Sequence, residues 1–267
     1  MINNLRFELS FKNIAQLENK LNFCKFNGIK NINIPCKGLI KKDLFKATIN
    51  YISNNFQEFN LTYHYSLYHQ YTKNRINSYQ DFLEFIKNSN SNRSYEVLLI
   101  SGSNKKNNFD VINVLNHMKS EKNLNVKLGV AHNPYLEKYY KINSERERLE
   151  KKTASGLINS IWFQYGTDIK VLNDEVTYLQ KTGKYEKLNL FGSLLIPSKQ
   201  FLARFKFRPW KGVYISKKYL YSLDDFYSFT RNLVFFYKKN NITPIIETDF
   251  SSFEKLDLIC SFLGIER

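Results

Sequence analysis

The feature that most constrains the fold is an alternation of strand-like and helix-like patterns along the whole chain. Short runs rich in β-branched and aromatic residues recur at steps of about 30 residues, the length of a βαβ unit. Between them, apolar residues recur at helical spacing. Eight such units in strict alternation predict an α/β protein with a closed (β/α)8 TIM barrel. The expected strands are residues 3–9, 30–34, 60–64, 96–100, 125–131, 158–164, 188–196 and 242–248.

The step between the last two strands is longer than the others. Residues 208–223 fit there as an insertion before the eighth strand. A length of 267 residues suits one barrel, and no stretch resembles a linker, so residues 1–267 are predicted to form a single barrel domain. An open, doubly wound sheet is the alternative, because it is built from the same units.

The chain is strongly basic, with a formal net charge of +16. Such a charge suits an anionic partner, and nucleic acid is one alternative. The Lys residues are scattered along the sequence, which favours a biased composition instead. We therefore expect no nucleic-acid partner.

Cysteine usage and hydropathy bear on the compartment. The three Cys residues lie far apart and form no CxxC pair, which favours a reducing compartment and argues against a cysteine-built zinc site. No metal site is predicted. The N-terminal residues contain no apolar run of signal-peptide length, and no 18-residue apolar stretch follows. We expect a cytoplasmic protein with no membrane partner, and a homo-oligomer is left open.

Barrel enzymes carry their chemistry on the loops after the strands, so polar residues at strand ends are the candidates. Glu8 ends the first expected strand between Phe7 and Leu9. Apolar surroundings raise the pKa of a carboxyl group, which suits a general acid; pairing with a nearby Lys is the alternative. His64 could contact a ligand or be a structural residue. Gln164 can both donate and accept hydrogen bonds, so it could recognise the edge of an amide-containing ring or cap a loop.

Several stretches resemble the methylenetetrahydrofolate reductase family, a family of (β/α)8 barrels. Their shared order extends along nearly the whole chain. The matching stretches are Phe7-Glu8, Tyr63-His64, Leu99 to Ser103, Leu128 to Ala131 with Pro134, Leu149 to Gly156, Gln164 with Asp168, and Gly192 to Pro197.

The resemblance implies a reductase that passes hydride from NAD(P)H, through FAD, to 5,10-methylenetetrahydrofolate and forms 5-methyltetrahydrofolate. Glu8 would be the catalytic acid, and Gln164 and Ser103 would contact the folate substrate. The resemblance also implies a set of flavin-contacting positions. These are His64, Ser101, Gly102, Ala131, Asn133, Glu145 and Lys152.

Four positions depart from the family pattern. Ser101-Gly102-Ser103 stands where the family has Arg-Gly-Asp, Pro35 replaces a Thr, and Asn133 replaces a Tyr. Each lost charged hydrogen bond costs roughly 1.5–3 kcal/mol, or about one to two decades of affinity. A flavin-free barrel that binds folate or another C1 carrier without redox chemistry therefore stays open as the alternative.

Overall fold

The structure is a computed structural model. It describes residues 5–37, 40, 42–89, 95–101, 109–121, 126–141 and 145–266, with the backbone alone at 88 and 89. No helix in these ranges is long and apolar enough to cross a membrane.

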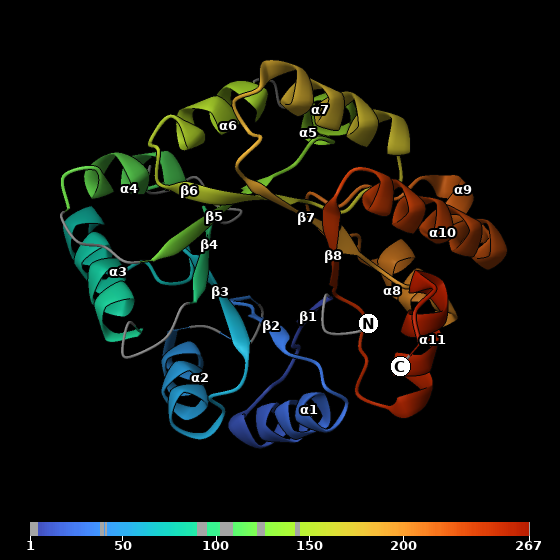
Figure 1. The fold of residues 1–267 in the computed structure, drawn as a ribbon, viewed down its shortest axis with the longest axis horizontal. Coiled ribbons are helices and arrows are strands. Elements are labelled where there is room, and N and C mark those ends of the chain that lie inside the picture. Colours follow the sequence, from blue (N-terminus) through green and yellow to red (C-terminus); the bar gives the residue numbers. More distant parts are fainter. Residues whose placement is uncertain are drawn as a thin grey trace. The chain divides into compact units, whose positions relative to one another are not determined.

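The described strands form a closed barrel in which β1 to β8 are neighbours in chain order (Figure 1). Every strand pair with a defined register is parallel. The predicted (β/α)8 class is confirmed, and each predicted strand overlaps an observed one. The strands are β1 (Arg6–Glu8), β2 (Asn31–Ile34), β3 (Asn60–Ser66), β4 (Glu96–Ile100), β5 (Lys127–His132), β6 (Ile158–Phe163), β7 (Asn189–Leu194) and β8 (Ile242–Ile246).

The helices alternate with these strands along the chain. Two short ones, α5 and α9, were not expected, because five residues are too few to show helical periodicity. The helices are α1 (Ile14–Phe26), α2 (Lys42–Asn55), α3 (Arg75–Ser89), α4 (Val111–Met118), α5 (Leu136–Tyr140), α6 (Glu145–Thr153), α7 (Ile169–Thr182), α8 (Lys199–Phe207), α9 (Lys217–Tyr221), α10 (Leu223–Lys239) and α11 (Phe253–Leu263).

Local chemistry explains several helix ends. Asp168 begins α7 by accepting a hydrogen bond from the backbone N–H of Val171, and Ser198 begins α8 in the same way through Phe201. After α6 the chain turns at Gly156, whose φ of 73° is the left-handed conformation that glycine adopts readily after a helix. These local signals place β6 directly after the turn.

Contacts within the chain group the described residues into two compact units, which we describe separately. Residues from 6 to 130 and from 150 to 159 form the β1–β4 unit; those before 6, from 131 to 149 and from 160 onwards form the β6–β8 unit. Aromatic rings fill the outer layer of each. The prediction of a single domain is not tested by this grouping. Rings in the β1–β4 unit include Phe45, Tyr63, Tyr65, Phe82 and Phe85, and those in the β6–β8 unit include Phe201, Phe205, Tyr219, Phe226 and Phe229.

The predicted insertion, residues 208–223, contains α9 and docks within the β6–β8 unit. The rings of Tyr214 and Tyr139 stack with centroids 3.4 Å apart. The hydroxyl of Tyr140 donates to the backbone oxygen of Val213 at 2.9 Å. The backbone N–H of Thr167 donates to the carbonyl of Tyr214 at 3.0 Å. The insertion is thus held against α5 and against the segment that follows β6.

Candidate functional site

A buried charge cluster lies at the carboxyl ends of β1 to β3. Glu8 is the last residue of β1, and its carboxylate is buried. Oε1 of Glu8 forms an ion pair with Nζ of Lys37, which comes shortly after β2. Nδ1 of His64, on β3, lies 3.5 Å from Oε2 of Glu8. Three neighbouring strand ends therefore meet at one carboxylate.

The ionisation of Glu8 differs from the sequence prediction. Burial alone would raise its pKa, as its apolar neighbours Phe7 and Leu9 suggested. The charges of Lys37 and His64, with the hydrogen bond from Lys37, outweigh burial and hold the pKa of Glu8 below its usual value. The prediction of a raised pKa was wrong, and the alternative of pairing with a Lys is confirmed. Glu8 is a carboxylate at neutral pH in this arrangement, and it offers acceptors.

His64 is buried and electrically neutral at physiological pH. Burial lowers its pKa to about 4, although the neighbouring carboxylate of Glu8 acts in the opposite direction. The charges of Lys37 and Arg6 lower it further. A neutral imidazole can donate and accept at once, so His64 can serve a polar ligand without adding charge.

Arg6 supplies a second polar layer on the same strand face as Glu8, because alternate residues of a strand share a face. Its Nη1 donates to Oγ1 of Thr62 at 2.7 Å and to Oδ1 of Asn33 at 3.1 Å. Burial lowers the pKa of Arg6, and the charge of Glu96 raises it. Within this part of the barrel the polar side chains therefore bind one another across β1, β2, β3 and β4.

A second buried cluster, in the β6–β8 unit, surrounds His132 at the end of β5. Nε2 of His132 lies 2.9 Å from Oε1 of Glu175 on α7. Nδ1 lies 3.7 Å from Oε1 of Glu145 on α6. Arg146 contacts the other oxygen of Glu175 at 2.8 Å, and Arg148 contacts Glu145 at 2.9 Å. We call these five residues the His132 cluster.

The surroundings of His132 favour the protonated form of its imidazole. Burial lowers its pKa, but the hydrogen bond to Glu175 and the charges of Glu175 and Glu145 outweigh burial and raise it. The pKa of Glu175 is lowered in return, because His132 and Arg146 stabilise its carboxylate more than burial destabilises it. The cluster clamps the end of β5 to α6 and α7. Glu145 is therefore part of an internal ion-pair network.

Gln164 directly follows β6 and lies near the end of β5. Its backbone N–H donates to the carbonyl oxygen of His132 at 2.9 Å. Its side-chain Oε1 accepts from the backbone N–H of Tyr165 at 3.0 Å. The side chain is half-buried, as is that of Ala131 on β5. The His132 cluster and Gln164 are thus joined through one backbone hydrogen bond.

The other residues predicted to contact a flavin bind within the protein, are buried, or lie outside the described residues. Nδ2 of Asn133 donates to the carbonyl of Gly212 in the insertion at 2.8 Å. Oγ of Ser101 accepts from the N–H of Val111, at the start of α4. Lys152 is buried on α6. Gly102 and Ser103 lie outside the described residues.

These arrangements do not fit a flavin held by the predicted polar groups. The side-chain oxygen of Ser101, the amide of Asn133 and the carboxylate of Glu145 are each engaged within the protein. Contacts to FAD from those atoms would require these partners to be replaced. We derive no chemical step through FAD.

Sequence patterns did not identify two of the partners that define these clusters. Lys37 follows a strand, as site residues do, but nothing local shows that it reaches Glu8. Glu175 lies in the middle of α7, far along the sequence from His132. The sequence signal that could have identified Glu175 is its place on the apolar face of an amphipathic helix, where a Glu is rarely buried without a partner.

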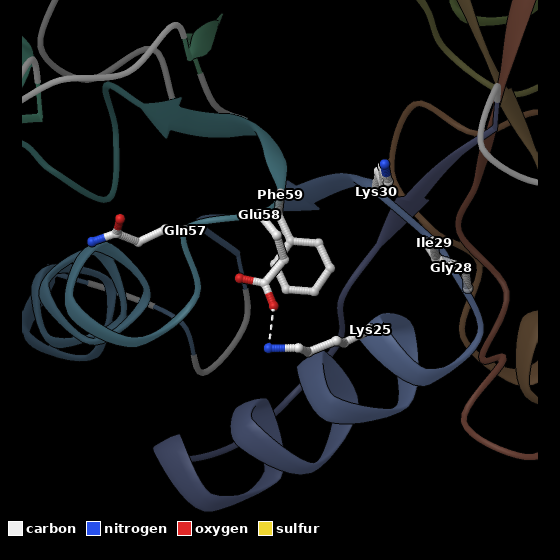
Figure 2. Close-up of a pocket in the computed structure, with 7 residues that line it drawn as sticks. All are labelled: Lys25, Gly28, Ile29, Lys30, Gln57, Glu58 and Phe59. Atoms are coloured by element: carbon white, nitrogen blue, oxygen red, sulfur yellow. Dashed lines mark ion pairs between the residues drawn. The ribbon is translucent and has the colours of Figure 1, made fainter.

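One pocket of about 590 Å³ lies in the β1–β4 unit, away from the Glu8 carboxylate (Figure 2). It is bordered by the end of α1 and by the segments that lead into β2 and β3, at the amino-terminal ends of those strands. An ion pair of 2.8 Å between Lys25 and Glu58 crosses it. Chemistry in this fold lies at the opposite strand ends, so we assign the pocket no role.

No family model and no curated protein matches the sequence. Solved structures do match. An uncharacterized protein from Clostridium thermocellum that binds two copies of 5-methyl-5,6,7,8-tetrahydrofolic acid aligns with a TM-score of 0.65 at 14% identity, over 97% of this chain and 92% of that one.

Two glycoside-cleaving enzymes are also similar. The catalytic domain of a chitinase from Pyrococcus furiosus aligns with a TM-score of 0.53 at 9% identity, over 91% of this chain and 83% of that one. An intracellular xylanase from Thermoanaerobacterium saccharolyticum gives 0.51 at 12% identity, over 91% and 85%. At such identities the likeness establishes the fold alone.

Proposed function

We propose that this chain is a barrel that binds a reduced folate. The observation that carries the proposal is the buried Glu8 carboxylate, held by Lys37 and His64 at the ends of three parallel strands. Two further points support it. The family resemblance implies that Glu8 is the catalytic acid that acts on a folate, and a structurally similar barrel binds 5-methyl-5,6,7,8-tetrahydrofolic acid.

The chemistry of the cluster suits the pterin ring of a folate. The ring carries amino and ring N–H groups that need acceptors, and an ionised carboxylate is the strongest acceptor among side chains. Neutral His64 adds a group that can donate or accept. In the β6–β8 unit, Gln164 carries an amide that can both donate to and accept from the polar edge of a pterin ring.

Titration calorimetry with 5-methyltetrahydrofolate tests the proposal directly. We expect saturable binding, and we expect Gln164→Ala to weaken it by about tenfold, the effect of one or two lost hydrogen bonds. Gln57→Ala is the matched control, because it removes the same amide side chain at an exposed position near the amino-terminal strand ends. Folate binding is refuted if 5-methyltetrahydrofolate gives no heat of binding and other reduced folates show no competition for a site.

Reduction of 5,10-methylenetetrahydrofolate with NAD(P)H, through FAD, is a finer candidate for the same site. It is supported by the retention of Glu8 and Gln164 in the resemblance. Because Glu8 is ionised, proton donation would first require a proton to reach it, for example when a bound ligand separates it from Lys37.

An absorption spectrum decides whether flavin takes part. If the chain is a flavin-dependent reductase, we expect absorption bands at about 380 and about 450 nm in the purified protein or after addition of FAD. NAD(P)H should bleach these bands. If the protein is colourless and added FAD does not bind to it, FAD is no longer part of the proposal. Folate binding is measured separately and would stand in either case.

A further inference from the structure

Nearly half of the net positive charge is concentrated in one segment of the β6–β8 unit. Residues 199–222 contain seven Lys or Arg residues and no Asp or Glu, in a chain whose net charge is +16. The sequence alone suggested that cations were scattered. The fold places this segment on α8, the insertion and α9, which are in contact.

Exposed aromatic rings alternate with these cations. The exposed fraction is 93% for Phe207, 77% for Tyr221 and 44% for Trp210. Around them, six cationic side chains are also exposed. We call the nine residues the aromatic–basic patch: Arg204, Lys206, Phe207, Arg208, Trp210, Lys211, Lys217, Lys218 and Tyr221.

Two of the rings are held in position by neighbours. Nζ of Lys206 lies 4.2 Å from the centre of the Tyr221 ring, which is a cation–π contact. The Trp210 ring packs edge-on against Phe201 and Phe205, with centroids 5.5 and 6.1 Å away. Rings that are ordered before a ligand arrives lose less conformational entropy on binding.

We propose that the aromatic–basic patch binds single-stranded nucleic acid. Proteins that bind single strands combine cations that follow the phosphates with aromatic side chains on which bases stack. The exposed rings of this patch lie among cations, and residues 199–222 contain no Asp or Glu. Asp225, just beyond the segment, pairs with Lys218 at 3.5 Å. That ion pair occupies one of the six cations of the patch, so phosphates would contact others such as Arg208 and Lys217. The proposal goes beyond folate binding and does not depend on it.

An anionic membrane is less consistent with this surface. Helices that lie on membranes bury a contiguous apolar face. Here only three exposed rings accompany six exposed cations, so the patch offers little apolar surface to insert into a bilayer.

Fluorescence anisotropy with a labelled oligothymidylate of about 20 nucleotides tests the proposal with the full chain. We expect binding that weakens steeply between 50 and 200 mM salt. The triple variant Lys206→Gln, Arg208→Gln and Lys217→Gln should bind about tenfold or more weakly at low salt. Its slope of log affinity against log salt should fall by about 2, because each phosphate contact on a single strand contributes about 0.7.

A matched charge control carries Lys46→Gln, Lys119→Gln and Lys170→Gln, which removes three exposed cations elsewhere. The control should bind nearly as tightly as the unaltered protein. Equal losses in both triple variants would overturn the proposal, because binding would then reflect net charge alone.

The aromatic contribution has its own pair of variants. Phe207→Ala with Tyr221→Ala should weaken binding about tenfold and leave the salt slope unchanged, since stacking releases no counterions. Phe26→Ala with Phe235→Ala removes two similarly exposed rings as the control. Failure to bind the oligonucleotide, or patch-dependent binding only to vesicles containing anionic lipid, would also overturn the proposal.

Discussion

Replacing His132 with Asn should lower the free energy of unfolding by about 3 kcal/mol. The imidazole ring lies buried between the carboxylates of Glu145 and Glu175, which favour its protonated form. Removing one partner of a buried ion pair costs about 3–5 kcal/mol, because the remaining charge is left in a poorly solvated environment. Arg146 and Arg148 still contact the two carboxylates, so we expect the lower end of that range.

The loss should depend on pH. The folded protein raises the pKa of His132 above its usual value of 6.5. The stability that comes from its charge is therefore fully present below about pH 6.5 and is lost as the pH rises through the folded pKa. The difference between unaltered and variant protein should be largest in mildly acidic solution and should shrink in alkaline solution.

Urea unfolding followed by circular dichroism, repeated over a range of pH, measures both effects. His117→Asn is the matched control, because His117 is exposed on α4 and the same substitution there should change stability by less than about 0.5 kcal/mol. Equal stability of the His132 variant and the unaltered protein at acidic pH would mean that the cluster does not hold a cation.

The second large effect concerns Glu8→Gln. If the chain reduces methylenetetrahydrofolate, loss of this carboxyl group should lower turnover by about 10²–10⁴, the usual contribution of a general acid. If the chain only binds folate, there is no turnover to lose. In that case the affinity alone should fall by about tenfold, because a neutral amide accepts more weakly than a carboxylate.

Calorimetry and a turnover assay on the same preparation separate these outcomes. Glu58→Gln is the control, since it removes a Glu paired with a Lys, at the other strand ends of the same unit. Both variants should unfold cooperatively, so a change in function is not a folding defect. Unchanged affinity and unchanged turnover in Glu8→Gln would remove Glu8 from the site.

Position in the sequence indicated which residues lie at strand ends, but not what they contact. Glu8 ends β1 and Gln164 follows β6 as predicted, whereas β3 continues two residues past His64. The pKa of Glu8 was predicted in the wrong direction, because burial is visible in neighbouring residues whereas the Lys37 ion pair is not. Asn133 was assigned to a flavin and instead holds Gly212, which is 79 positions away.

The sequence by itself determined the order and type of the elements. These are local properties, because they depend on residues that are close together in the sequence. They include the strand and helix periodicities, side-chain caps such as Asp168 and the left-handed glycine Gly156. Only the tertiary structure decided the charge states and partners. Those depend on burial and on residues brought together from distant positions, as when Glu175 on α7 meets His132 on β5 or when Lys37, after β2, reaches Glu8 on β1.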